Sequence, residues 1–181
     1  MASVAELNTK FGNPKGSNGK VNPTWAQNNL VEVELPYRMK IAWDLDEYVT
    51  HINFHKLGAH ALEQALNAAY NQARILVKAK FGLNHDSIYF DEKTRLYLSD
   101  RRLDLYGGAY NYRTMRTNPN ILSTHSWGIA IDIDPAHNMQ GNAGKIPEWF
   151  GKCFEDAGFV WGKRWSSKIR DTMHFEFTRG L

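Results

Sequence analysis

The chain has 181 residues, of which 43% are hydrophobic and 13% aromatic, and its formal net charge is +3. This length and composition suit one globular domain with a substantial core and exclude a largely disordered chain. The mild positive charge is compatible with an anionic polymer as partner, but it falls short of the basic footprint of a nucleic-acid-binding protein.

The N-terminal region, residues 1–30, is predicted to be an arm that packs on the rest of the chain. Residues 8–24 are rich in Asn, Gly, Pro, Ser and Lys, which is typical of loops, and Phe11 and Trp25 are the expected anchors. Residues 1–20 contain no apolar run of a signal peptide, and no stretch reaches the roughly 20 apolar residues of a membrane span. We therefore expect synthesis as a cytoplasmic protein without a membrane anchor.

The middle of the chain predicts strands on either side of one long helix. Residues 30–35 alternate apolar and acidic side chains, which indicates a strand that Pro36 ends. Residues 57–81 carry alanine and leucine at spacings of three and four, which predicts a long amphipathic helix. Residues 87–90 and 95–98 are predicted as two short strands around a turn.

Most of the histidines outside the later motif are predicted to be structural. His51 and His55 form an H-x-x-x-H pair, but Ile52 stands where a zincin helix requires glutamate, so a metal role is disfavoured. Surface or structural roles are also expected for the lone histidines in polar sequence: His60, His85 and His137.

Residues 109–113 are predicted to form another strand after Gly107 and Gly108. Alternation along this strand places Arg113 on the same side as Ala109 and Asn111. From the residues alone, an arginine that points into a cleft and an arginine on the surface are equally good interpretations.

The stretch 123–134 has the outline of a metal site. Ile129, Ile131 and Ile133 alternate with small or acidic residues, which predicts a strand that carries Asp132 on the face opposite the core. His125 precedes Gly128, whose backbone freedom allows the imidazole to fold back toward that carboxylate.

The C-terminal third is predicted to contain a helix and the last strand. Pro135 ends the motif strand, residues 138–145 form a loop, and residues 146–157 form an amphipathic helix in which Cys153 is a buried thiol rather than a nucleophile. Residues 159–161 return to the sheet, and a basic loop, 163–170, follows.

The final segment, 171–177, is predicted to supply the third ligand of the metal site. Met173, Phe175 and Phe177 share one face of a strand, so His174 and Glu176 share the other. Two imidazoles and one carboxylate suit a catalytic zinc that keeps a position open. Glu176 is either an acceptor for a ligand imidazole or a carboxylate at the rim of the site, and Ser123 either caps its loop or orients His125.

Ser-x-His-x-x-Gly-x-Ala-x-Asp from Ser123, followed by Asp-x-x-His-Phe from Asp171, resembles the family of zinc D-Ala-D-Ala carboxypeptidases and L-alanyl-D-glutamate endopeptidases, which includes many phage endolysins. The resemblance extends to residues 110–113, 161–165 and 11–14, and so covers roughly the whole chain.

This resemblance implies a role for each candidate residue. His125, Asp132 and His174 would be the zinc ligands, Asp171 the general base, and Arg113 the partner of the substrate carbonyl. One departure is that many relatives have a glycine and a less bulky residue where this chain has Lys163 and Arg164, which bears on what the cleft accepts.

The expected function is that of a zinc-dependent peptidoglycan peptidase of the endolysin type. Asp-x-x-His-Phe is similar to the phage endopeptidases, which favours the L-alanyl-D-glutamate bond of the stem peptide. One alternative is a D-Ala-D-Ala carboxypeptidase that uses Lys163, Arg164 or Lys168 to hold a terminal carboxylate. The other is a non-catalytic domain that keeps zinc for stability, against which Asp171 and Arg113 argue, because a structural zinc needs neither a base nor an oxyanion donor.

We therefore expect a small α+β protein, a single metallopeptidase domain over residues 1–181 without a separate wall-binding domain. A mainly antiparallel sheet would pack against the helices at 57–81 and 146–157, with the zinc cleft on the sheet. The expected state is a monomer that binds the stem peptide and no nucleic acid or membrane. It would stay in the host cytoplasm until another factor releases it to the cell wall.

Overall fold

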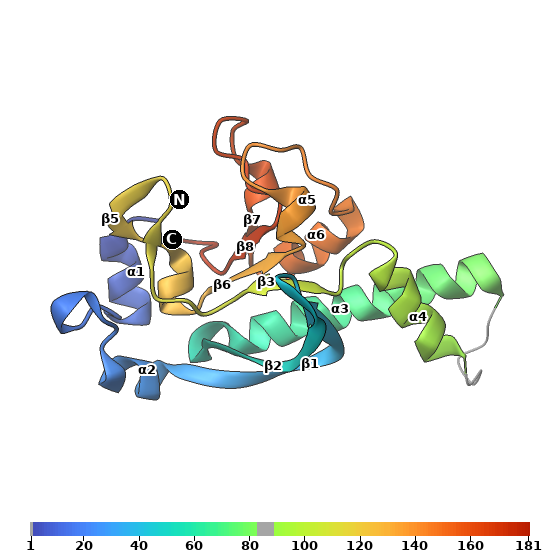
Figure 1. Ribbon diagram of the computed structural model, residues 1–181, viewed down its shortest axis with the longest axis horizontal. Helices are drawn as coiled ribbons and strands as arrows, with labels where there is room; N and C mark the ends of the chain where they lie inside the picture. The colour runs from blue at the N-terminus through green and yellow to red at the C-terminus, as the bar shows by residue number, and fades with distance from the viewer. Residues whose placement is uncertain (1, 83–88) are drawn as a thin grey trace.

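A six-stranded sheet in the order β2-β1-β3-β6-β8-β7 forms the centre of the computed structural model, which describes residues 2–82 and 89–181 (Figure 1). All neighbouring strands are antiparallel except β1 and β3, which are parallel. The strands of this sheet are β1 (Leu30–Ile41), β2 (Asp44–His55), β3 (Leu105–Gly108), β6 (Ala130–Ile133), β7 (Val160–Trp161) and β8 (His174–Glu176). A separate hairpin consists of β4 (Thr114–Met115) and β5 (Asn118–Leu122). The predicted α+β class with a mainly antiparallel sheet is confirmed.

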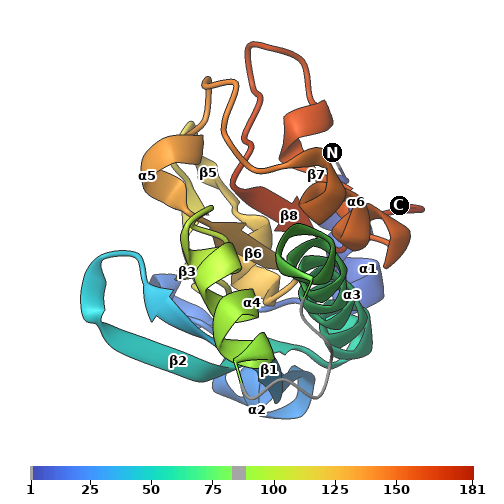
Figure 2. The ribbon, with the colours of Figure 1, turned by 90° about the vertical axis from the view of Figure 1, so that its right-hand side faces the viewer.

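The long helix α3 (Lys56–Phe81) packs along the sheet, as Figure 2 shows in a view almost down its axis. Its alanine and leucine stripe, which includes Leu62 and Leu66, is fully buried, and it ends at Gly82 in the left-handed conformation. The predicted helix 57–81 is therefore confirmed, and its apolar stripe forms the centre of the main core.

Helix α6 (Glu148–Asp156) covers the same face of the sheet as α3. Phe150 and Phe154 are fully buried, and Phe154 stacks on Phe175 of β8 at 4.3 Å. The predicted helix 146–157 is confirmed with narrower bounds, because Pro147 is its N-cap and Ala157 its C-cap. Cys153 is half-buried and donates to the Trp149 carbonyl, and burial raises the pKa of its thiol, so it has the character of a structural residue.

The predicted strands over 87–90 and 95–98 are wrong where the structure describes them. Helix α4 (Phe90–Ser99) replaces them, and residues 87 and 88 lie outside the described residues. Phe90, Thr94 and Leu98 are buried at intervals of four, which is a helical period, and two acidic residues lie in the first turn.

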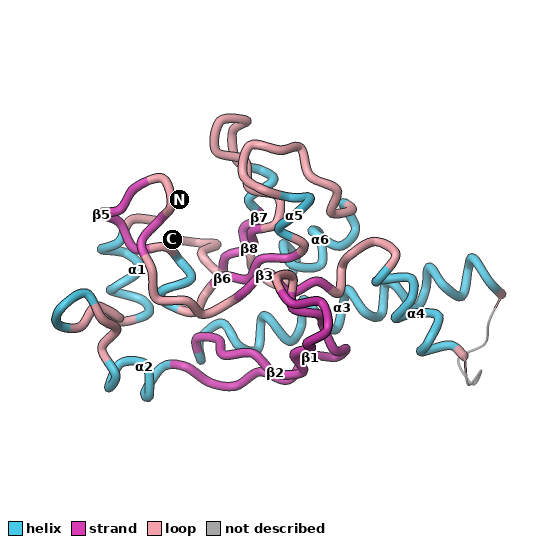
Figure 3. The backbone as a smooth tube through the Cα atoms, viewed as in Figure 1, coloured by secondary structure: helices cyan, strands magenta, loops and turns pink. Residues whose placement is uncertain are grey.

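The predicted strand over 109–113 is also wrong. These residues form an irregular segment that follows β3, as the tube in Figure 3 shows. The backbone of Arg113 bonds to the Ser126 hydroxyl and the Ser123 amide instead of to a neighbouring strand.

The first strand does not end at Pro36, because a bulge accommodates the missing N–H group. Glu34 pairs with His51 and Met39 with Val49, so β1 has extra residues between these pairs. Proline is tolerated at such an irregularity, and β1 continues to Ile41.

The N-terminal residues contain helices where a loop was predicted, α1 (Val4–Phe11) and α2 (Pro23–Asn29), with a short 3-10 turn, η1 (Ser17–Gly19), between them. Ser3 begins α1 with a capping box, which residue composition alone did not reveal. The two predicted anchors are buried, Phe11 to 1% exposure and Trp25 to 6%. They join Leu7, Trp127 and Ile129 in a second apolar cluster.

The described histidines outside the motif are either exposed or held by structural contacts, and their described contacts do not indicate a metal site. His55 is buried, begins α3 as its N-cap and contacts the Phe11 carbonyl at 3.0 Å, whereas His51 is exposed on β2. His60 is exposed near Glu63, and His137 contacts Asp134 at 3.2 Å. His85 lies outside the described residues.

Among the described helices, none is long and apolar enough to cross a membrane.

Candidate metal centre

His125, Asp132 and His174 converge on the face of the sheet opposite α3. Asp132 on β6 and His174 on β8 are direct partners across the two strands. His125 comes from a 3-10 turn, η2 (Thr124–Trp127), just before β6. All three side chains are buried, and each offers a ligand atom within 4.8 Å of the others. The structure therefore brings together the three residues that the sequence singled out as ligands.

The imidazole of His125 has one nitrogen fixed by the backbone and one directed at the site. Nδ1 donates to the Ala109 carbonyl at 2.6 Å, so in the neutral ring Nε2 carries the lone pair. Nε2 is buried, has no hydrogen-bond partner within residues 2–82 and 89–181, and lies 3.3 Å from an oxygen of Asp132. Gly128 closes this turn at a φ of +65°, where a Cβ atom would lie 2.7 Å from Leu30 Cδ2.

His174 lies between two buried carboxylates. Nδ1 is 2.9 Å from Asp132 Oδ1 and Nε2 is 3.1 Å from Glu176 Oε2, while the Thr178 hydroxyl donates to the other Glu176 oxygen. Burial alone would lower the pKa of His174, but the two carboxylates outweigh it and raise that pKa to about 10. Glu176 therefore acts as an acceptor for the imidazole, the first of the two roles expected for it.

The residues present fit a divalent cation. Burial alone would raise the pKa of Asp132, but His125 and His174 hold it well below its ordinary value, so this carboxylate is ionised. The unpartnered nitrogen of His125 and the buried carboxylate face each other in a donor set of two imidazoles and one carboxylate. Zinc sites commonly use this set, with a second carboxylate behind a histidine, as Glu176 is behind His174.

Asp171 lies beside the triad with an unused carboxylate oxygen. Its Oδ1 is buried and has no hydrogen-bond partner among the residues that the structure describes. Burial raises the pKa of Asp171 to about 6, although His174 acts to lower it. Its backbone is held by Gly162, whose carbonyl accepts from the Asp171 amide at 3.1 Å, and a Cβ atom at Gly162 would lie 2.3 Å from the Asp171 carbonyl oxygen.

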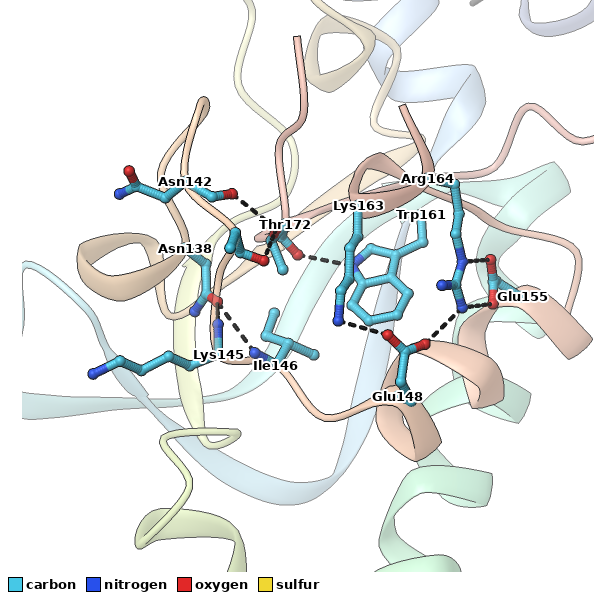
Figure 4. Close-up of polar contacts among 11 residues, drawn as sticks. Asn138, Asn142, Lys145, Ile146, Glu148, Glu155, Trp161, Lys163, Arg164 and Thr172 are labelled. Carbon is cyan, nitrogen blue, oxygen red and sulfur yellow. Dashed lines mark hydrogen bonds and ion pairs between the residues drawn. The ribbon is translucent and has the colours of Figure 1, made fainter. Parts of the chain in front are cut away.

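A hydrogen-bonded network surrounds Thr172, the residue that follows Asp171 (Figure 4). The indole of Trp161 donates to the Thr172 carbonyl at 2.8 Å, and the Thr172 hydroxyl donates to the Ala143 carbonyl at 3.1 Å. Asn138, at the end of α5 (Pro135–Asn138), accepts from the amides of Lys145 and Ile146. The loop after β6 is thereby tied to the segment that carries Asp171.

Lys163 and Arg164, in the 3-10 turn η3 (Gly162–Arg164), are engaged elsewhere. Lys163 pairs with Glu148 at 2.6 Å, and Arg164 pairs with Glu148 and Glu155 (Figure 4). Neither lines the cavity that contains the triad. The expectation that they hold a substrate carboxylate is not supported, because both charges are already neutralised by glutamates of α6.

Arg113 lines the same cavity as the triad and Asp171. It is half-buried, and burial lowers the pKa of its guanidinium, an effect that Asp132 opposes. Its backbone is tied to η2, since its amide donates to the Ser126 hydroxyl and its carbonyl accepts from that hydroxyl. The Ser123 amide donates to the same carbonyl. In the described part of the chain the Ser123 hydroxyl neither caps the turn nor bonds to the His125 ring, so neither role expected for it is seen.

The cavity has a volume of ≈ 790 Å³ and is also lined by residues that the sequence did not single out. One wall comes from α1 and the β4–β5 hairpin, and the facing wall from residues 140–141 and 165–169. Trp165 lies 5.6 Å from His174, ring to ring. Nothing in the local sequence marks α1 or the hairpin as part of the site, because long-range packing places them there.

The buried triad and the neighbouring carboxylate form a candidate metal centre that fits a metallopeptidase, and part of the chain matches a peptidase family. Residues 116–177 match the family model described as D-alanyl-D-alanine carboxypeptidase. This segment contains the whole triad and Asp171. The chain matches no curated protein and no solved structure.

Proposed function

We propose that the protein is a zinc-dependent peptidoglycan peptidase that cleaves the stem peptide, with His125, Asp132 and His174 as metal ligands. The observation that carries this proposal is the buried triad beside Asp171, a carboxylate with an unpaired buried oxygen in the same cavity. The matched family model supports a peptide of the bacterial wall as substrate.

His125, Asp132 and His174 would hold a zinc ion, which would supply a Lewis acid for making water more acidic and polarising the scissile carbonyl. The rest of the chemistry falls to side chains of the cavity. Asp171 accepts the proton of the attacking water and delivers it to the departing amine. Its pKa of about 6 in the metal-free protein, which a nearby cation lowers further, leaves the carboxylate ionised at neutral pH.

Arg113 acts on the substrate oxygen as negative charge develops there. It is the cavity-lining arginine whose backbone is bonded to the turn that carries His125. A guanidinium held in a partly dry site stabilises an oxyanion more strongly than it would in water. Glu176 accepts from His174 and keeps its other nitrogen directed at Asp132.

We infer that the bond cleaved is L-alanyl-D-glutamate, as in a phage endolysin. The support is the Asp171-to-Phe175 motif, which resembles the endopeptidase branch. A D-Ala-D-Ala carboxypeptidase is the second candidate, favoured by the description of the matched family.

Digestion of purified peptidoglycan distinguishes the two candidates. We expect muropeptides with a new amino-terminal D-glutamate, detected by mass spectrometry after labelling of free amines. Release of free D-alanine with the rest of the stem intact would instead establish the carboxypeptidase. A matched digest with the Asp171→Asn variant controls for contaminating hydrolases.

A further inference from the structure

We propose that Arg116 binds a carboxylate of the substrate and so makes the enzyme selective for an acidic stem peptide. This inference rests on the proposed function, because it names the group of the peptide that the same cavity recognises.

The carboxylates of the cavity are held close to the metal ligands, whereas its cations lie on the walls. Asp132 and Glu176 are both bonded to His174. The cations that line the cavity are Arg113, Arg116 and Lys168. These three cations line the space that a bound peptide would occupy, which favours an anionic substrate.

Arg116 is available for a ligand. It lies in the two-residue turn of the β4–β5 hairpin, because Met115 and Asn118 are partners across the strands. Its side chain is exposed, and in the part of the chain that the structure describes it forms no hydrogen bond or ion pair. Lys163 and Arg164, in contrast, are paired with glutamates.

Arg116 lines the same cavity as the groups proposed to react. Arg113 and Asp171 also line it, so a peptide bound at these two residues occupies the cavity into which Arg116 opens. A guanidinium presents a planar fork that matches a carboxylate in two parallel hydrogen bonds. Lys168 lies on the facing wall and offers only a point charge.

The same hairpin supplies an apolar surface beside Arg116. Ile121 lines the cavity with 38% of its surface exposed, and Val4 of α1 lines it with 36% exposed. A short aliphatic side chain next to a carboxylate matches this combination, and an alanyl-glutamyl segment has both. The D-glutamate α-carboxylate is thus the group that we assign to Arg116.

The test compares two acyl-L-alanyl-γ-D-glutamyl-L-lysine peptides, one with the free D-glutamate α-carboxylate and one with a carboxamide there. Their dissociation constants are measured by calorimetry on the zinc-loaded Asp171→Asn variant, with and without Arg116→Gln. We expect the carboxylate peptide to bind about 10-fold more tightly than the carboxamide, and Arg116→Gln to abolish this difference. Arg95→Gln, at an exposed position of α4, removes the same charge and should leave the difference intact.

In kinetics with an otherwise unaltered enzyme, Arg116→Gln should raise KM for the carboxylate peptide and leave kcat largely unchanged. Equal binding of the two peptides before substitution, or a selectivity that survives Arg116→Gln, would overturn the assignment. Because binding is measured without turnover, a chain that cleaves neither peptide contradicts the proposed function but still decides the role of Arg116.

Discussion

Replacement of Asp171 by Asn should reduce kcat by about 10²–10⁴-fold while zinc remains bound, because general acid–base catalysis contributes on that order. Asparagine has nearly the same shape but cannot accept the proton of the attacking water. The backbone bonds of Asp171 to Gly162 and His174 do not involve the side chain, so the local fold should persist. Steady-state kinetics on a labelled stem peptide, with the zinc content measured on the same sample, provide the test.

The pH dependence of this reaction has a defined sign. Because the pKa of Asp171 is raised to about 6 without metal, kcat/KM should fall only below pH 6, where the base becomes protonated. Because the pKa of Asp171 is raised in the folded state, ionisation of this carboxyl destabilises the folded protein. The destabilisation grows as the pH rises from the pKa of Asp171 in the unfolded chain toward 6. At pH 7, metal-free Asp171→Asn should therefore have a higher melting temperature than the metal-free parent.

Near-normal turnover in Asp171→Asn would transfer the role of base to another carboxylate, with Glu176 the first candidate.

Replacement of Arg113 by Ala should lower kcat by about 10²–10³-fold, which is the usual loss when one oxyanion donor is removed. The loss should fall mainly on kcat, because the charge that Arg113 stabilises develops in the transition state. Arg113→Lys keeps the charge and should recover part of the rate. Arg95→Gln, on α4, controls for the loss of one positive charge.

The melting temperature of Arg113→Ala must be measured alongside the kinetics, because the backbone at this position is hydrogen-bonded to Ser126 of η2, the turn that carries His125. These bonds involve only main-chain atoms of Arg113, so the melting temperature should change little. A rise in KM with unchanged kcat would contradict the proposed role and indicate ground-state binding instead.

The strongest periodic signals in the sequence predicted the right elements. The stripe of α3 recurs over many turns, and alternation in β6 and β8 correctly separated the core residues Ile131 and Phe175 from the site residues Asp132 and His174. Such signals are reliable because one face of each element is fully buried.

Short or half-exposed elements were missed or misassigned. Residues 90–98 contain few apolar positions, so β propensity suggested strands where a helix buries only three side chains. Strand β2 was not predicted, because most of its residues are exposed and its alternation is weak. The segment 109–113 alternates like a strand, but the backbone of Arg113 forms its hydrogen bonds with Ser123 and Ser126 instead of with a neighbouring strand. No local sequence pattern reveals these bonds.

The residues of the candidate site also fall into two groups, those that the sequence predicted and those that it missed. His125, Asp132, Asp171 and His174 were recognisable because their spacing resembles a known motif. Arg116 and the α1 wall enter the cavity through tertiary contacts, and the pairing of Lys163 and Arg164 with α6 was equally invisible in the sequence. Spacing thus identifies the candidate reacting groups, whereas the groups proposed to recognise the substrate require the fold.

Three side chains are proposed to hold one catalytic zinc, and metal analysis of the purified protein tests this most directly. Elemental analysis after dialysis should find about one zinc per chain in the unaltered protein and in Asp171→Asn, and much less than one in His174→Ala, because three protein ligands are needed for tight binding. The activity lost on chelation should return with added zinc only in the unaltered protein. A full equivalent of zinc in His174→Ala, or full activity of the unaltered protein after complete removal of metal, would contradict the account.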